Sequence, residues 1–389
     1  MKHPSRDSTN SLQHRPSTLR LPSGQKLGER ALDAALNALF RGLQPETRER
    51  FATTPDEGRL RRLYFRASDG WRAPLFALPA PTNGGGEPVI LAHGLGVNHH
   101  SLQLQRERSL AWALHRAGFQ VYLLTHRGDQ CAIAPPDGSG DFDFDHIVEQ
   151  DVPASIEAVL EDSGFPRLLW VGHGLGGQLL YGHLAQEGTH SVAAATAICA
   201  ATSFEAATTA ARTRQLALSL LPEGLRLPLG AVATLAAPAL RSGSAHMKRS
   251  EGPDARGIYR YATESLHGGL LQQVNRWLNE GYLSDRSGSR DLVAALSSME
   301  LPLQIVHSEG DSLCTPEAAK RPLEYLAGPR DLHTLPRGWG HLDPLIGRDA
   351  ESEVHPRVVE WLERHRSSTW ESEWPEVVAG DVDATTVRR

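Results

Sequence analysis

The chain has 389 residues, a length that fits one large domain with an inserted subdomain, or two domains. Its formal net charge of −6, without a basic block, argues against nucleic acid as a partner. No apolar run approaches the roughly 18–20 residues that cross a bilayer, and the polar N-terminus lacks the apolar region of a secretory signal. The three cysteines form no CxxC pair. We therefore expect a cytoplasmic protein without a transmembrane segment.

The two ends of the chain are expected to lie outside its folded part. Residues 1–29 are polar and show no apolar periodicity, which predicts a disordered arm. Residues 367–389 carry acidic side chains and predict a flexible tail. Residues 30–203 and 302–366 then form the two parts of one core, which begins with a helix over Glu29–Leu43.

Short apolar segments alternate with amphipathic segments through most of the core. Asp69 and Gly70 lie between the first two apolar segments and predict a hairpin. The expected strands are Leu63–Ala67, Pro74–Leu78, Val89–Ala92, Gln120–Thr125, Leu168–Gly172, Val192–Cys199, Leu303–His307 and Asp331–Leu335. The expected helices are Ser101–Ala117, Ile147–Leu160, Leu175–Gln186 and Asp349–Arg366. This order predicts an α/β fold with a mostly parallel, eight-stranded sheet flanked by helices.

Residues 204–301 break the alternation between two strands of the sheet. The segment has a helical pattern, interrupted at Pro222, Pro228, Pro238 and Gly243. An insertion of this size predicts a helical cap over the carboxyl ends of the strands, where α/β sheets bind ligands. Its leucines favour a small apolar ligand: Leu216, Leu218, Leu220, Leu221, Leu225, Leu227 and Leu229.

The most informative run of residues is Trp170–Gly177, which ends a strand and opens a helix. This is the context of the nucleophile elbow, Gly-x-Ser-x-Gly, in which a strained turn presents a nucleophile at a helix N-terminus. Gly172, His173 and Gly176 keep the frame of that motif. The central position, however, is Gly174, so no hydroxyl or thiol is available there.

Three further elements of a catalytic site lie where a fold with a nucleophile elbow requires them: oxyanion donors, an acid and a histidine. His93 and Gly94 end a strand, and the backbone N–H of Leu95 would be one oxyanion donor. The N–H of Leu175 would be the second. Asp311 and His341 each follow a later strand, so that the order along the chain is elbow, acid, histidine.

With these residues the chain resembles an α/β-hydrolase of the lipase and esterase group. The run His341–Ala350 is similar to the histidine segment of acid lipases, and Gln272–Pro302 is similar to the cap-to-strand passage of polyhydroxyalkanoate-synthase-like proteins. The resemblance covers about residues 60–366. It implies that Asp311 and His341 are the acid and base, that Leu95 and Leu175 are the oxyanion donors, and that Gly174 occupies the nucleophile position.

Other interpretations of single motifs are weaker. Residues 172–177 also match the glycine spacing of a dinucleotide loop, but they follow a late strand. His99 and His100 are adjacent and predict a solvated loop rather than a metal site. Asp137, Asp141, Asp143 and Asp145 lack the calcium-loop pattern, and Asp145 is expected to cap a helix. Cys199 and Cys131 lie near strand ends on the active-site side. Because the position of the nucleophile depends on the strained turn of the elbow itself, we do not expect either cysteine to replace the serine. We expect neither a metal nor a cofactor.

Three functions are compatible with a hydrolase frame that lacks its serine. The chain is an inactivated hydrolase, or it uses His341 and Asp311 as a base on a carbonyl substrate such as an apolar acyl ester. Alternatively, it is a non-catalytic pseudohydrolase that binds a small apolar ligand or a protein partner. The retention of both His341 and Asp311 favours a site that uses a base, because a binding module needs neither.

Overall fold

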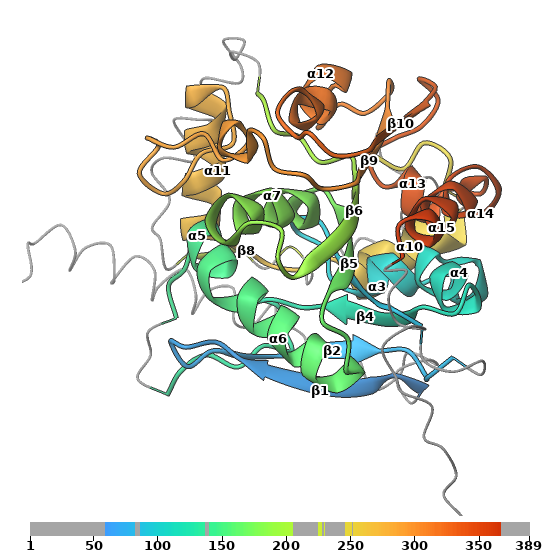
Figure 1. Ribbon diagram of the computed structural model, residues 1–389, viewed down its shortest axis with the longest axis horizontal. Coiled ribbons are helices and arrows are strands. Elements are labelled where there is room, and N and C mark those ends of the chain that lie inside the picture. Colours follow the sequence, from blue (N-terminus) through green and yellow to red (C-terminus); the bar gives the residue numbers. More distant parts are fainter. Residues whose placement is uncertain are drawn as a thin grey trace, which may run out of the picture.

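The computed structural model describes residues 59–81, 86–136, 140–204, 225–227, 229, 246–250 and 252–366. An eight-stranded sheet runs through the middle of the molecule in the order β1-β2-β4-β3-β5-β6-β9-β10 (Figure 1). Its strands are β1 (Arg61–Arg66), β2 (Arg72–Ala77), β3 (Pro88–Ala92), β4 (Gln120–Leu124), β5 (Leu168–His173), β6 (Val192–Ile198), β9 (Leu303–Ser308) and β10 (Arg330–Leu335).

The sheet is parallel except at one edge. β1 and β2 form the predicted antiparallel hairpin, and β2 also pairs antiparallel with β4. Every other pairing is parallel, so the carboxyl ends of β3, β5, β6, β9 and β10 lie at the same edge of the sheet. The central strands are buried on both faces, which explains their continuous apolar sequences. The expected eight-stranded α/β-hydrolase sheet is therefore confirmed.

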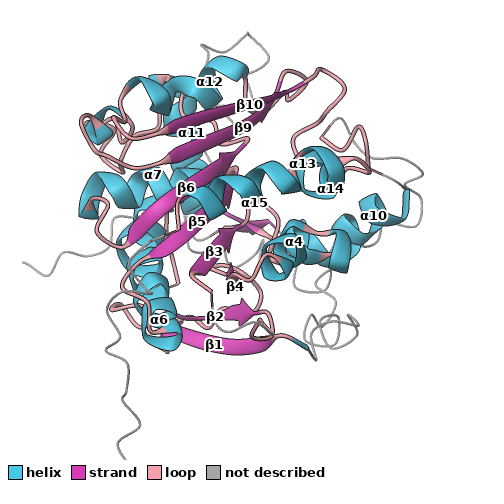
Figure 2. Cartoon of the chain, turned by 45° about the vertical axis from the view of Figure 1, so that its right-hand side comes forward, coloured by secondary structure: helices cyan, strands magenta, loops and turns pink. Residues whose placement is uncertain are grey.

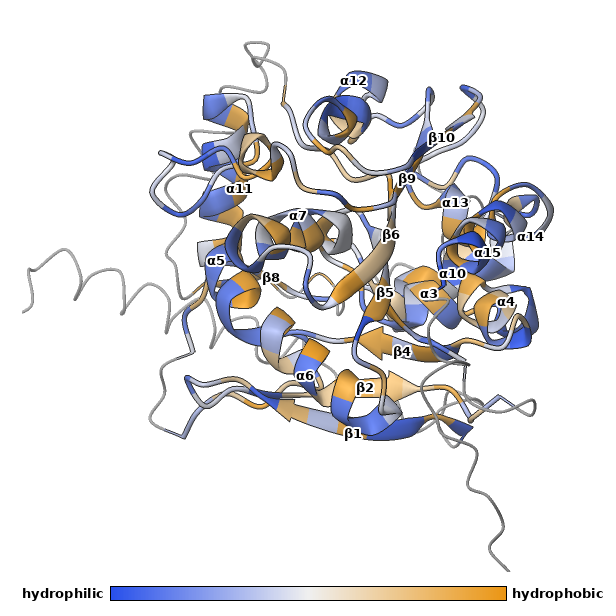
Figure 3. Cartoon of the chain, viewed as in Figure 1, coloured by the Kyte–Doolittle hydropathy of each residue, from blue (hydrophilic) through white to orange (hydrophobic). Residues whose placement is uncertain are grey.

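Helices cover both faces of the sheet. α6 (Val152–Ser163) and α7 (Leu175–Glu187) lie on one face, and α4 (Leu110–Arg116) and α15 (His355–Arg364) lie on the other (Figures 1 and 2). Figure 3 shows mostly apolar residues on the central strands and a largely hydrophilic α12 (Pro316–Lys320) and α14 (Ala350–Glu353) at the periphery.

Two helices that were predicted as continuous are interrupted. α3 (His100–Gln103), η2 (Arg106–Arg108) and α4 replace the first, because Ser109 has an extended backbone and caps α4 through Trp112 N. α14 and α15 are likewise separate, and Pro356 lies in the first turn of α15, where its missing N–H cannot continue a preceding helix.

The helix predicted from Ile147 is continuous and begins earlier. α5 (Phe144–His146), the π-helix η3 (Ile147–Asp151) and α6 follow one another without a gap, and the residues at their junctions are helical.

The insertion at residues 204–301 is only partly described. Its described elements are β7 (Arg226–Leu227), α10 (Gly252–Gly257), the π-helix η5 (Ile258–Ala262), β8 (Leu266–His267), α11 (Gly268–Glu280) and η6 (Ala294–Leu296). β7 and β8 form a small antiparallel pair that a purely helical cap did not predict. The proposed arm, the helix over Glu29–Leu43 and the tail lie outside the described residues. Among the described helices, none has the length and apolarity needed to cross a bilayer.

Candidate active site

The turn between β5 and α7 has the geometry of a nucleophile elbow. Gly174 has φ 50° and ψ −113°, a strained backbone of the kind that the motif requires, and α7 begins at the next residue. Close backbone packing explains the flanking glycines. A Cβ on Gly172 would lie 2.3 Å from the Gly176 carbonyl oxygen, and one on Gly176 would lie 2.2 Å from the Ala92 carbonyl oxygen. The elbow therefore depends on glycines at its flanks rather than on its central side chain.

The position of the absent nucleophile faces His341. A Cβ built on Gly174 would lie 3.3 Å from His341 Nε2 and 3.6 Å from the Gly94 Cα. These two residues provide its nearest neighbours, so a side chain at this position would point at the imidazole. A Cβ fits there only if the ring shifts by a few tenths of an ångström. His341, Gly94 and Gly174 thus converge at the carboxyl edge of the sheet, as the sequence predicted.

The other nitrogen of His341 contacts Asp311. The Nδ1–Oδ2 distance is 2.7 Å, and the Asp311 side chain is fully buried. Desolvation by burial raises the pKa of Asp311, but the hydrogen bond and charge of His341 lower it more, so the net pKa lies below the ordinary value of 3.8. An ionised carboxylate only accepts hydrogen bonds, so Nδ1 carries the ring proton and Nε2 keeps its lone pair. That lone pair faces Gly174, which is the orientation a general base requires.

The candidate oxyanion donors are the residues that follow Gly94 and Gly174, whose backbones approach each other here. Leu95 follows Gly94, and Gly94 packs against His173, whose Nδ1 would be 2.9 Å from a Cβ on residue 94. Leu175 is the first residue of α7. In the described part of the chain, the amides of Leu95 and Leu175 donate to no backbone carbonyl. Both are therefore free to donate to a ligand. His173 helps to hold the backbone of His341 in place, because its Nε2 lies 3.0 Å from the carbonyl oxygen of His341.

The histidine loop, residues 338–349, depends on a carboxylate that the sequence did not single out. Asp343 is fully buried, and its Oδ2 accepts from the backbone N–H groups of Gly340, Lys248 and Arg249 at 2.6, 2.8 and 3.0 Å. Its Oδ1 accepts from the Ser250 hydroxyl at 2.9 Å. Asp343 therefore ties the loop that carries His341 to residues 248–250 of the insertion.

The cysteines near the site are poor substitutes for the serine. Cys199 follows β6, has φ 49° and is buried. Its thiol belongs to a group with Asp311 and His341 in which one ligand atom of each lies within 4.8 Å of the others. Burial, followed by the charge of Asp311, raises the pKa of Cys199 well above its ordinary value. Burial likewise raises the pKa of Cys131. Both thiols therefore stay protonated at neutral pH, and a thiol is a far weaker nucleophile than a thiolate.

The prediction of a solvated loop at His99 and His100 is wrong. Both side chains are buried, and His99 stacks on Phe76 with ring centroids 4.0 Å apart. Burial lowers the pKa of His99 well below its ordinary value, so that its ring is neutral. The adjacent Asn98 is also buried and donates to Glu264 Oε1 at 2.9 Å. The loop after β3 is thus an interior segment packed beneath the insertion.

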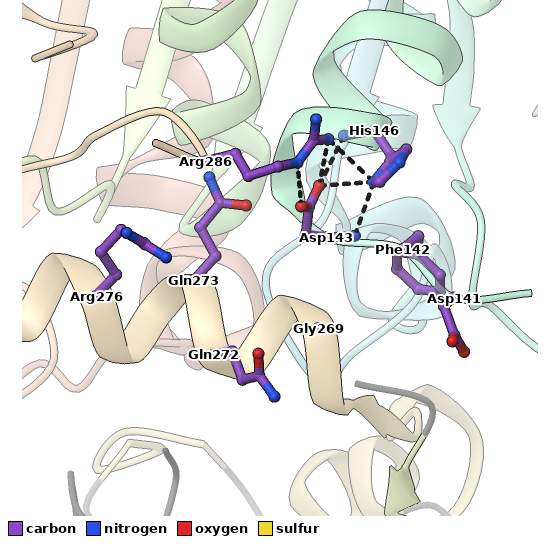
Figure 4. Close-up of a pocket in the computed structure, with 9 residues that line it drawn as sticks. All are labelled: Asp141, Phe142, Asp143, His146, Gly269, Gln272, Gln273, Arg276 and Arg286. Atoms are coloured by element: carbon purple, nitrogen blue, oxygen red, sulfur yellow. Dashed lines mark hydrogen bonds and ion pairs between the residues drawn. The ribbon is translucent and has the colours of Figure 1, made fainter. Parts of the chain in front are cut away.

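The helix-cap assignment in the aspartate-rich loop also needs correction. Asp143, not Asp145, caps the helix, because its side chain accepts from His146 N at 3.1 Å. Asp145 is buried and accepts from Gln273 and from the backbone of Arg286. Asp143, Gln273 and Arg286 line a pocket of about 310 Å³ between α11 and residues 141–146 (Figure 4). None of Gly174, Asp311 and His341 lines that pocket.

Comparison with known proteins identifies the family. Residues 87–346 match the model of the alpha/beta hydrolase fold family. Gastric triacylglycerol lipase of Bos taurus is 31% identical over 121 residues, which cover 28% of this chain and 30% of the lipase. The chain thus matches about a third of the length of that relative.

Solved structures of low sequence identity share the fold. A monoacylglycerol lipase of Paleococcus ferrophilus (19% identity, TM-score 0.51) and a hydrolase of Pseudomonas aeruginosa (20%, 0.52) each cover 79% of this chain, which covers 99% of each of them. The alpha/beta hydrolase GrgF of a Penicillium species is 18% identical and has a TM-score of 0.55. It also covers 79% of this chain, and 99% of its own length is matched. The chain belongs to the α/β-hydrolase fold family, and lipases and esterases are among the proteins it resembles.

Proposed function

We propose that the protein acts on the carbonyl group of an apolar acyl ester or a related substrate, with His341 as a general base oriented by Asp311. The reaction would proceed without an acyl-enzyme, because Gly174 offers no nucleophile. The single observation that carries the proposal is the position of His341 Nε2, 3.3 Å from the Cβ position of residue 174. The apolar acyl substrate is supported by the lipases among the relatives.

The proposed reaction uses water in place of the serine hydroxyl. A water molecule between Gly174 and His341 gives a proton to Nε2 while its oxygen attacks the carbonyl carbon. The negative charge that develops on the carbonyl oxygen is stabilised by the N–H groups of Leu95 and Leu175. When the tetrahedral intermediate collapses, the C–O bond to the alcohol breaks and the imidazolium returns its proton to the leaving oxygen. Asp311 stays ionised throughout and stabilises the imidazolium.

Ester hydrolysis by the native sequence tests this function. We expect hydrolysis of p-nitrophenyl esters of medium chain length at a rate that falls by about 10²–10⁴ in His341→Ala. His190→Ala is the matched control, because His190 is an exposed histidine elsewhere on the surface. Equal rates in the native protein and His341→Ala, over a series of chain lengths, would rule out His341 as a base.

The absence of a nucleophile favours one alternative, a binding protein for a small apolar ligand. Such a protein would bind its ligand at the same site and would not need His341. It predicts that a fatty acid or a non-hydrolysable ester analogue binds equally well to the native protein and to His341→Ala, while neither hydrolyses esters. Calorimetric titration of both proteins with the same ligand separates the two functions.

A further inference from the structure

A second cluster of polar side chains is buried behind the oxyanion loop. His93 ends β3, and His126 and Asp129 belong to the turn after β4. One ring nitrogen of each histidine and one carboxylate oxygen of Asp129 lie within 4.8 Å of one another. The rings of His93 and His126 have centroids 4.8 Å apart. All three residues are more than nine-tenths buried. Adjacent strands β3 and β4 therefore present imidazole and carboxylate ligand atoms to one small volume.

Backbone carbonyls fix the orientation of both histidines. His93 Nδ1 lies 3.0 Å from the carbonyl oxygen of Gly94, and His126 Nδ1 lies 2.8 Å from that of Arg127. Because a carbonyl accepts, each Nδ1 carries a proton, an arrangement that also supports metal-ligating histidines. Nε2 of His93 contacts Asp129 Oδ2 at 3.0 Å, so a metal ion there would replace the proton between these two atoms.

Two buried atoms in and beside the cluster lack partners. Within the described residues, His126 Nε2 and Glu264 Oε2 have no hydrogen-bond partner. The other oxygen of Glu264 is held by Asn98 at 2.9 Å. Glu264 is 3% exposed. A buried carboxylate oxygen without a partner is costly unless a cation or a proton lies with it.

We propose that His93, His126, Asp129 and Glu264 form a binding site for a single divalent transition-metal ion, most simply Zn²⁺. Two imidazoles and two carboxylates are a ligand set that suits tetrahedral zinc, with ligand bonds of about 2.0–2.2 Å. Neighbouring ligand atoms around such an ion are roughly 3.3 Å apart. His93 Nε2 and Asp129 Oδ2 are already 3.0 Å apart. One ring nitrogen of His126 lies within 4.8 Å of both. Glu264 lies outside that group and would complete the ligand set only by a movement of its side chain.

The position of this site gives it a role in the fold. His93 immediately precedes the loop of Gly94 and Leu95, while Glu264 belongs to the insertion and pairs through its N–H with the Gly96 carbonyl at 2.9 Å. An ion here would join β3, the turn after β4 and the insertion. It would therefore stabilise the loop that carries a candidate oxyanion donor, without contacting the substrate.

Zinc binding to the full-length, untagged protein tests the proposal. Protein freed of metal with a chelator is titrated with ZnCl₂ by calorimetry, and thermal unfolding is measured with and without zinc. We expect one ion per chain and a higher Tm with zinc, since an ion that binds only the folded state stabilises it. His126→Asn keeps a donor for the Arg127 carbonyl but removes the proposed ligand. It should weaken zinc binding by at least about tenfold.

Two further variants make the result specific. Glu264→Gln removes the fourth ligand and should also weaken binding, so the test does not depend on the folding of one variant. His183→Asn, which replaces another buried histidine on α7 outside the cluster, should bind zinc as the native protein does. Failure of the native protein to bind zinc would overturn the proposal, and the His93–Asp129 contact would then be a simple ion pair. Native-like zinc affinity in both His126→Asn and Glu264→Gln would overturn it as well.

Discussion

The elbow at Gly174 is held by backbone contacts, whereas the histidine loop is held by side chains. At the elbow, Gly172 and Gly176 allow the close approach of the backbone, and the turn keeps its shape without a central side chain. In the histidine loop, the Asp343 carboxylate accepts four hydrogen bonds, and Asp311 orients the imidazole of His341. A substitution at residue 174 can therefore remove the nucleophile and leave the geometry intact. A substitution in the histidine loop should disturb both chemistry and stability.

The largest effect is expected from Gly174→Ser. The new hydroxyl would lie beside His341 Nε2, so a serine nucleophile with its base should form. We expect ester hydrolysis to rise by at least about 10³-fold, since loss of such a serine costs more than this in related systems. The positive φ adds strain of roughly 1–3 kcal/mol. Intact mass spectrometry should detect an acyl-enzyme, and Gly174→Ala, with similar strain but no hydroxyl, should give none. A folded Gly174→Ser protein that forms no acyl-enzyme would show that the turn at Gly174 does not present a nucleophile to His341.

A smaller loss of rate is expected from Asp311→Asn in the native background. The amide cannot stabilise an imidazolium and can reverse the ring tautomer, so ester hydrolysis should fall by about 10²-fold or more. Glu309→Gln, an exposed change in the same loop, is the control and should have native activity. If both variants retain native kcat, then Asp311 has only a structural role.

The sequence predicted those parts of the site that short motifs encode. The strand–turn–helix at Gly174 is local, and so its strained turn could be predicted. The order of Gly94, Gly174, Asp311 and His341 along the chain predicted their convergence, because parallel strands end at one edge of the sheet. The strand boundaries also agree closely, since buried strands have continuous apolar runs.

The supporting contacts could not be predicted because they join distant segments. The donors to Asp343 come largely from residues 248–250, about 90 positions earlier in the chain. Glu264 meets Asn98 across a still longer separation of 166 positions. Neither contact has a local pattern. By contrast, the break before α15 did have a signal, because Pro356 lies within the predicted helix.

A substitution of Asp343 should show its main effect in the free energy of unfolding. Asp343→Asn replaces a carboxylate that accepts four hydrogen bonds with an amide that must turn its NH₂ group toward donors. We expect a loss of about 2–4 kcal/mol in the free energy of unfolding. Glu351→Gln, an exposed change on α14, should have almost no effect in the same denaturant titration. A loss for Asp343→Asn as small as that of the control would show that the histidine loop does not depend on this carboxylate.

The smallest expected effect is a change in the pH dependence of stability, and it concerns His173, the elbow residue beside His341. Burial, followed by the charge of His341, lowers the pKa of His173 from 6.5 to about 3. Below pH 6.5 the unfolded chain therefore binds a proton that the folded chain does not, and stability falls with pH. At pH 5 this costs about 2 kcal/mol relative to pH 7. His173→Gln keeps a donor for the His341 carbonyl but does not titrate, so it should lose less stability between pH 7 and pH 5. Equal losses in variant and native protein would mean that His173 is solvated.

The most direct test of the central claim is a double-mutant cycle across the two regions. Rates of ester hydrolysis and acyl-enzyme formation are measured for the native protein, Gly174→Ser, His341→Ala and the double variant. If the elbow and the histidine loop form one site, the gain from Gly174→Ser should disappear when His341→Ala is present. A gain of the same size in both backgrounds would show that residue 174 and His341 do not act on the same substrate, and would contradict the account.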